Sequence, residues 1–160
     1  MINTVVNTLA EKKISDFQVF EFSDILSLPV DKSTYGSSHV GDVVKVGGQY
    51  GILHSEIAPT AEELKTLTSA VNFDPRSLNT FGLNVTPGYA SVRIHGGVYK
   101  LKVSHTGPAA VGAAVYAKNT VSGGVTELTT DSTGGTKIGF LYNALTGTGP
   151  SSVVPVVFTA

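Results

Sequence analysis

The chain has 160 residues, of which 14% are charged and 41% are hydrophobic, and its formal net charge is −1. This length suits one domain with its own core, and the composition excludes an intrinsically disordered chain. The absence of cysteine excludes disulfides, thiolate metal sites and a cysteine nucleophile. The net charge argues against nucleic acid as the main partner, and no apolar run approaches the roughly 18–20 residues of a membrane span. We therefore expect a soluble, β-rich domain that associates with itself, with no direct nucleic-acid or membrane partner.

The first 38 residues differ in pattern from the rest of the chain. They lack the basic-then-apolar order of a secretory signal, because Lys12 and Lys13 follow the first ten residues. We therefore expect a chain that starts near Met1 and is made in the cytoplasm. Residues 31–38 are polar and turn-like, which is typical of a linker. The sequence thus predicts an extended N-terminal arm over 1–38, joined to a β domain over 39–160.

The arm carries an unusual load of large apolar residues between positions 17 and 28. They would lie on both sides of an extended strand, so one thin domain could not bury them all. One interpretation is that they bind a neighbouring subunit, and the other is that they form an extra strand or helix on this domain's own core. The candidate partner-binding residues are Phe17, Val19, Phe20, Phe22, Ile25, Leu26 and Leu28.

Two segments have the pattern of β-hairpins. Val-rich residues 40–46 and residues 49–54 flank Gly47-Gly48, and glycine tolerates the positive φ angles of tight hairpin turns. Around Gly96-Gly97, apolar residues alternate with charged ones on both sides, which predicts half-buried antiparallel strands. Both turns read Gly-Gly-x-Tyr-x-aliphatic, which indicates either an internal duplication or convergent turn chemistry.

One helix is expected after residue 59. Thr60 and Glu63 have the spacing of a capping box, and Ala61, Leu64, Leu67 and Val71 recur at helical spacing. A loop rich in Asn, Pro and Gly follows over 72–88, so 59–88 is interpreted as a helix-plus-loop insertion.

The C-terminal part is expected to form further short strands over 113–118, 125–129, 137–143 and 153–158. Strands and helices do not alternate, so we predict a mostly β fold, a small antiparallel barrel or sandwich of about eight strands with one short helix. Charge is unevenly divided, since residues 1–88 carry net −4 and residues 89–160 carry net +3. Such a dipolar subunit could pack against copies of itself, or the asymmetry could be chance.

The four histidines and the charged residues are the candidates for catalytic or metal-binding chemistry. His54 and Glu56 would share a strand face, but a zinc site needs three or four ligands and no third is identifiable. His39 with Asp42, and His105, are weaker candidates. Glu62 and Glu63 fit the dipole of a helix N-terminus better than a glycosidase pair. We therefore assign no catalytic residue, no metal ligand and no cofactor.

Neither nucleophile motifs nor phosphate-binding loops occur. Serine never stands in Gly-x-Ser-x-Gly, and no Gly-rich loop has the spacing of a phosphate cradle. Arg93, Lys100 and Lys102 are expected on the outer face of the second hairpin, with Tyr99 on the other face. Basic and aromatic groups then do not combine into a nucleic-acid platform, so we interpret this face as solvated.

A family resemblance extends this interpretation. A Gly-bounded hairpin over 89–102 is followed by Gly-x-x-Val-Tyr at 112–116, a Gly-rich turn, Ile-Gly-Phe within 137–141 and a final strand. In this order the motifs resemble those of tailed-bacteriophage head decoration, or capsid cement, proteins, and residues 41–44 suit that family's first strand. The resemblance covers 39–57 and 89–160.

The resemblance implies a structural role without catalysis. Such proteins form a small β-barrel or β-tulip domain, assemble as homotrimers on the outer capsid surface and tie neighbouring major capsid proteins together in the virion. Two alternatives remain open: another phage structural part, such as a tail tube or head–tail connector, and a carbohydrate- or cell-surface-binding β module. Exposed tyrosines would serve the latter, although Tyr50 and Tyr99 are expected to be buried.

Overall fold

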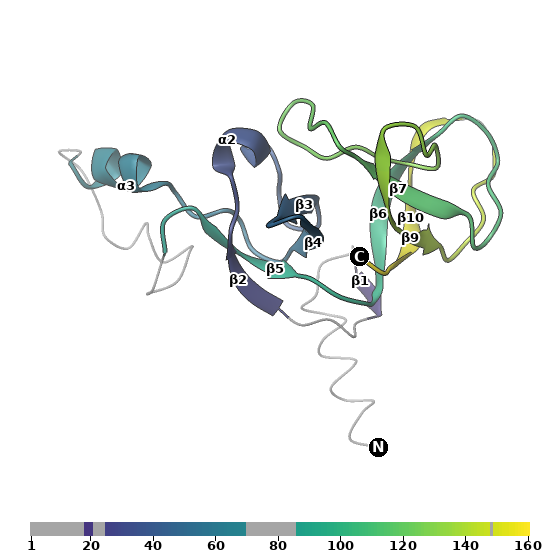
Figure 1. Cartoon of the computed structure of the whole chain (residues 1–160), viewed down its shortest axis with the longest axis horizontal. Helices are drawn as coiled ribbons and strands as arrows, with labels where there is room; N and C mark the ends of the chain where they lie inside the picture. The colour runs from purple at the N-terminus through teal and green to yellow at the C-terminus, as the bar shows by residue number, and fades with distance from the viewer. Residues whose placement is uncertain (1–17, 21–24, 70–85, 148) are drawn as a thin grey trace, which may run out of the picture.

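The computed structural model describes residues 18–20, 25–69, 86–147 and 149–160, and this part of the chain is mostly β. It consists of a closed barrel, a separate four-stranded sheet and two short helices. In Figure 1 the molecule is elongated, with the sheet between α3 at one end and the barrel at the other. The predicted mostly β fold with a small barrel is confirmed.

The barrel closes through a parallel pair of strands. Its order is β6-β10-β9-β7-β8, and β8 pairs in parallel with β6 at Val103↔Leu128 and Ser104↔Thr129. Short β1 adds to the outside of this sheet, also on β6. The strands are β1 (Gln18–Phe20), β6 (Val98–His105), β7 (Ala114–Lys118), β8 (Leu128–Thr129), β9 (Gly135–Leu141) and β10 (Gly149–Phe158).

Strict alternation in β6 fills the barrel. Tyr99, Leu101 and Val103 are buried, whereas Lys100 and Lys102 between them are exposed. Opposite them, β10 contributes its own alternate residues, among them Val154, Val156 and Phe158. This is the period-two pattern that the sequence predicts for the segment.

The second sheet has the order β2-β5-β4-β3 and is antiparallel throughout. Its strands are β2 (Ile25–Pro29), β3 (Val43–Val46), β4 (Gln49–Leu53) and β5 (Tyr89–Arg93). The hairpin predicted around Gly47-Gly48 is confirmed, with φ angles of 58° and 91° at the two glycines. A side chain at either position would be strained, which is why the turn needs glycine.

The second predicted hairpin is wrong. β5 pairs with β2 and β4, whereas β6 pairs with β1, β8 and β10 in the barrel. Gly96 and Gly97 do have positive φ angles, but they turn the chain from one sheet into the other. The glycine pair predicts a turn correctly, but it carries no information on which strands pair across it.

One face of the four-stranded sheet packs directly on the barrel. Val43, Tyr50 and Ile52 belong to the same core cluster as the barrel interior. The Tyr50 hydroxyl lies 3.2 Å from Asn119 Oδ1 of the barrel, and the Tyr99 and Phe158 rings meet edge to face. Sheet and barrel therefore share one continuous core, and the expected burial of Tyr50 and Tyr99 is confirmed.

Residues 30–38 cover the opposite face of this sheet. The predicted linker contains α2 (Lys32–Tyr35), which Asp31 caps at its N-terminus. Tyr35 is buried, and its hydroxyl accepts a hydrogen bond from the Lys45 backbone N–H at 3.1 Å. Reading 31–38 as a linker is therefore wrong, because Tyr35 makes the segment part of the packed structure.

A glycine at the barrel surface allows this cover to approach closely. Ser38 is buried and its hydroxyl donates to the Gly124 carbonyl at 2.8 Å. Gly124 has φ +80°, and a Cβ there would lie 2.8 Å from the backbone N of Ser37. Glycine is required at this position by both conformation and space.

The second helix, α3 (Ala61–Thr68), has the predicted capping box. Glu63 N–H donates to the Thr60 hydroxyl, and Thr60 N–H donates to the Glu63 carboxylate. None of its eight residues is buried, and Leu67 is 46% exposed, so the expected apolar stripe does not enter the described core. Val71 and most of the predicted 72–88 loop lie outside the described residues. The domain boundaries at 38 and at 59–88 stay predictions.

Candidate interaction surfaces

The edge strand β2 carries an exposed apolar surface. In the part of the chain that the structure describes, β2 pairs with β5 alone. Ile25 and Leu26 are 43% and 42% exposed, and adjacent strand residues point to opposite faces of a sheet. Leu28 instead packs against the sheet's own cluster. An edge strand with exposed apolar side chains on both faces is suited to pairing with another chain.

The structure separates the seven predicted partner-binding residues. Phe17 and Phe22 lie outside the described residues, and Val19 and Phe20 belong to β1, whose side chains are also outside the described part. Ile25, Leu26 and Leu28 belong to β2 on the other sheet. A role of these residues in binding a partner stays a prediction, and Ile25 and Leu26 are the two that the structure places at the surface.

Arg93 is buried, contrary to its predicted place on an outer face. It is 2% exposed and lies on the side of β5 opposite Val92. Its Nε and Nη2 lie 3.3 and 3.0 Å from His54 Nδ1, and it also forms a side-chain hydrogen bond with Tyr99 of the barrel. Burial lowers the pKa of Arg93, and the contact with Tyr99 partly offsets this. The alternation of residues in β5 correctly predicts which side chains share a face, but both faces of this strand are covered by other parts of the fold.

Three of the histidines, His105, His54 and His39, make ordinary hydrogen bonds. His105 is buried, with Nδ1 3.1 Å from the Gly107 carbonyl and Nε2 3.0 Å from the Ser152 hydroxyl. His54 accepts from Arg93 through Nδ1, because a guanidinium can only donate. His39 lies at the surface, 3.2 Å from Glu56. Within the described ranges, no three His, Asp or Glu side chains form a group that could hold a metal ion.

The outer face of β6 and β10 combines lysines with apolar side chains. Lys102 lies opposite Val153, which is 67% exposed, and Lys100 lies opposite Pro155. Both lysines are exposed as predicted, but Arg93 does not join them. This face is therefore a mixed cationic and apolar surface, and β1 pairs with β6 at its edge.

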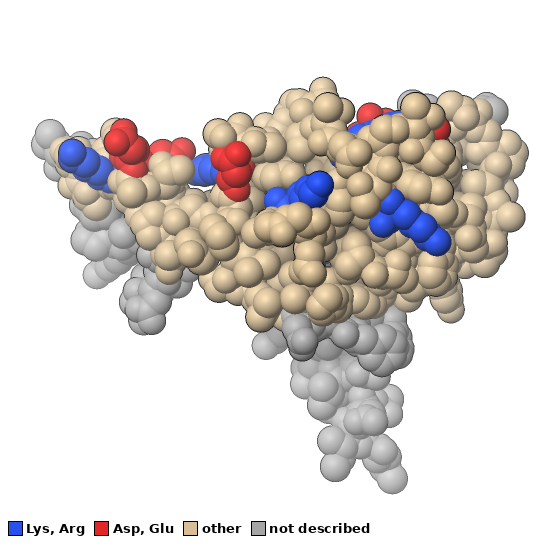
Figure 2. Space-filling model, viewed as in Figure 1, with Lys and Arg blue, Asp and Glu red and all other residues tan. Residues whose placement is uncertain are grey.

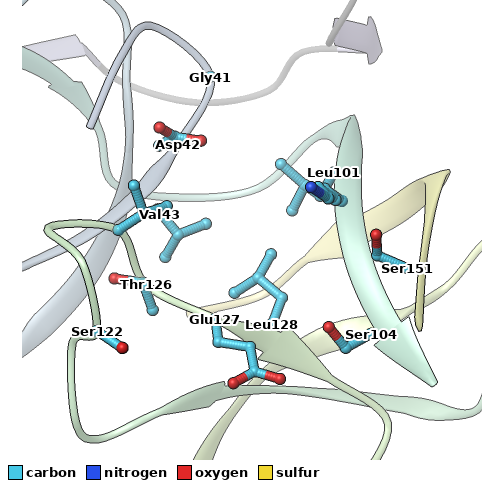
Figure 3. Close-up of a pocket in the computed structure, with 12 residues that line it drawn as sticks. Gly41, Asp42, Val43, Leu101, Ser104, Ser122, Thr126, Glu127, Leu128 and Ser151 are labelled. Carbon is cyan, nitrogen blue, oxygen red and sulfur yellow. The ribbon is translucent and has the colours of Figure 1, made fainter. Parts of the chain in front are cut away.

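A hollow of about 340 Å³ lies where the sheet meets the barrel. Its walls are formed by residues 41–43, which lead into and begin β3, by the 122–128 segment, and by strands β6 and β10. Figure 3 shows two carboxylates on opposite walls, Asp42 at the top of the view and Glu127 at the bottom. Ser104, Ser122 and Ser151 add hydroxyl groups, and Lys102 adds one ammonium group. The lining is thus polar and carries an excess of one negative charge.

Charge differs between the two parts of the molecule. Residues 25–69 and 86–97, which form the helices and the four-stranded sheet, carry net −1, and residues 98–160, which form the barrel, carry net +2. Figure 2 shows acidic and basic side chains together over α3 and α2 at one end, basic side chains on the front of the barrel, and acidic beside basic side chains at the upper edge of the barrel. Lys32 pairs with Glu63 at 2.7 Å, and Lys118 lies 3.7 Å from Asp131. The predicted asymmetry is therefore distributed in space as well as in sequence.

Comparisons with known proteins place no further constraint on these surfaces. No family model matches the chain, no curated protein matches it, and no solved structure matches it. Among the described residues, no helix has the length and apolar character to cross a membrane.

Sequence reasoning missed the hollow and the Arg93 contacts. The hollow is made by segments around residues 42, 102 and 127, which are far apart in the chain and carry no shared motif. The sequence gives no sign that Arg93 is buried, because an arginine in an alternating strand is usually at the surface.

Proposed function

We propose that the chain is a structural virion protein, a decoration or cement protein that binds the outer surface of a phage head. It would contact the major capsid protein, assemble as a homotrimer and carry out no catalysis. The motifs around residues 89–158 support this proposal through their resemblance to that family. The exposed Ile25 and Leu26 on edge strand β2 carry it furthest, because they offer backbone and apolar side chains to a second chain.

The physical basis of cementing is linkage. A protein that binds the assembled lattice and not free capsid subunits stabilises the lattice through the free energy of that binding. Many copies on one head multiply the effect, since each site adds its own stabilisation. An edge strand suits this role because main-chain hydrogen bonds and two apolar side chains give a compact contact that repeats at every equivalent position.

The proposal is tested by charged substitutions on β2. Ile25→Asp with Leu26→Asp places two carboxylates on the exposed edge, so we expect binding to expanded heads of the encoding phage to fall at least about tenfold, the effect of roughly 1.4 kcal/mol. Co-sedimentation with heads measures it. Leu28 is left unchanged because it packs in the sheet's own cluster.

Val111→Asp is the matched control. Val111 is 64% exposed and lies outside the strands, so it introduces the same kind of charge away from β2. We expect it to bind heads like the unchanged protein. Equal binding by the β2 variant and the control, with both folded, would contradict the proposal.

A further inference from the structure

One edge of β6 has a break in its pairing. β1 pairs with this edge at Val98 and Tyr99, and β8 pairs with it at Val103 and Ser104. The other edge of β6 is fully occupied by β10. No described strand therefore pairs with residues 100–102 on the β1 side, and Leu101 and Lys102 of this stretch also line the hollow, together with Ser104.

The register of β1 points the preceding residues towards this break. β1 runs antiparallel to β6 with Gln18 opposite Tyr99. Continued backwards without a shift, this register places Phe17 opposite Lys100 and Ser15 opposite Lys102. At least 17 residues precede β1, which is ample to fill three positions of a strand.

Residues 12–17 include Lys12, Lys13 and Asp16 and carry net +1, whereas the lining of the hollow carries net −1. Asp42 and Glu127 lie on its opposite walls (Figure 3). Lys12 and Lys13 precede Ser15 by two and three residues, and a strand advances about 3.3 Å per residue. β8 already pairs with Val103 and Ser104, so a segment that follows the break must leave β6 there, beside the hollow.

We propose that the hollow and the break in β6 form a docking groove for residues 12–17 of the same chain. The segment extends β1 across Lys100–Lys102 by main-chain pairing and brings Lys12 and Lys13 to the carboxylates of Asp42 and Glu127. The occupant belongs to the same chain because it is continuous with β1, which is already on β6. This inference does not depend on the proposed capsid role, because it concerns the isolated protein.

Disulfide trapping tests the register directly. The native chain has no cysteine, so Ser15→Cys with Lys102→Cys introduces one possible bond. Directly opposed strand residues have Cα atoms about 4.5–5.5 Å apart, within the range that a disulfide spans. We expect rapid oxidation to an intramolecular disulfide, seen as a monomer with altered mobility on a non-reducing gel and a mass lower by two hydrogens.

The control pair is Ser15→Cys with Lys137→Cys. Lys137 is exposed on β9, which β10 separates from β6, so we expect its disulfide to form at least ten times more slowly. Equal rates for the two pairs would overturn the proposed register. A disulfide-linked dimer as the main product of the 15–102 pair would assign the groove to a second copy and also overturn the proposal.

The charge contribution has its own test in the 15–102 background. Glu127→Lys should slow disulfide formation several-fold, and adding Lys12→Glu and Lys13→Glu should restore it. Glu127 is chosen because its side chain is exposed, whereas Asp42 accepts a hydrogen bond from the His39 backbone N–H. An unchanged rate of disulfide formation in Glu127→Lys would contradict the proposed contact between the lysines and the carboxylates.

Discussion

At the scale of single residues, Arg93 links the four-stranded sheet to the barrel. It belongs to a strand of the four-stranded sheet, yet its hydrogen-bonding partners include Tyr99 of the barrel and His54 at the end of β4. Val92, its neighbour in the strand, lies in the cluster on the opposite face. One strand therefore contributes an apolar side chain to one interface and a cation to the other.

Removing this cation should destabilise the fold. Arg93→Ala leaves the His54 ring nitrogen and the Tyr99 hydroxyl without their donor and opens a cavity, so we expect a loss of roughly 3 kcal/mol in the free energy of unfolding. Urea denaturation followed by circular dichroism measures it. Lys100→Ala, an exposed lysine of the barrel, should change stability by no more than about 0.5 kcal/mol. Similar losses for the two variants would contradict the structural role of Arg93.

At the scale of elements, α2 and α3 are tied by a single carboxylate. Glu63 Oε2 accepts from Lys32 Nζ at 2.7 Å and from the Thr60 backbone N–H at 2.8 Å. The hydrogen bond from Lys32, followed by that from Thr60, lowers the pKa of Glu63. The bond from Thr60 closes the helix's own capping box, whereas the ion pair with Lys32 links α3, which buries none of its residues, to α2.

The lowered pKa predicts an acid-sensitive helix. A carboxylate with a lowered folded-state pKa stabilises the fold above its unfolded pKa, and this stability is lost as pH falls through the folded value. We expect amide protection of Leu64 and Ser69 to fall as pH drops below about 4, the ordinary range for glutamate. Hydrogen exchange measures this. In Glu63→Gln the same amides should be less protected at neutral pH and lack this acid step; an identical profile would contradict the account.

The strands of this fold were predictable where their signal is local. Alternation in Val98–His105, the Gly47-Gly48 hairpin and the Thr60 capping box are each read from a few adjacent residues, and each is confirmed. Which strands pair with each other could not be predicted in the same way from adjacent residues. The Gly96-Gly97 turn leads into a different sheet, because the pairing of β5 with β2 depends on contacts about 65 residues apart in sequence.

The candidate surfaces follow the same division. The apolar load of residues 17–28 was evident from composition, but only the fold shows that Ile25 and Leu26 remain exposed while Leu28 packs inward. Reading 31–38 as a linker failed because one tyrosine among polar residues is a weak signal, yet Tyr35 is buried and holds the edge of β3.

At the scale of the whole molecule, an elongated subunit presents differently charged ends. Over the described residues, the helices and the four-stranded sheet carry net −1 and the barrel carries net +2. Contacts of opposite charge between copies favour a defined orientation, and such head-to-tail contacts form a ring where the rotation between copies closes. The proposed homotrimer is one such closed assembly.

The oligomeric state can be measured in solution. We predict a native mass of three times the 16.6 kDa chain by light scattering, with partial dissociation in high salt because charge contributes to the contact. A hexamer or a larger ring would favour a tail or connector part instead. A mass of one chain at all concentrations would contradict a trimer in solution.

The stability of the head itself tests the central claim most directly. Expanded heads are heated with increasing amounts of the protein, and the temperature at which packaged DNA is released is recorded. Because binding to the assembled lattice stabilises it by linkage, we predict that this temperature rises and then saturates once every site is filled. The Ile25→Asp, Leu26→Asp variant should need at least about ten times more protein to give the same rise. A release temperature that does not rise with saturating unchanged protein would contradict a cementing role.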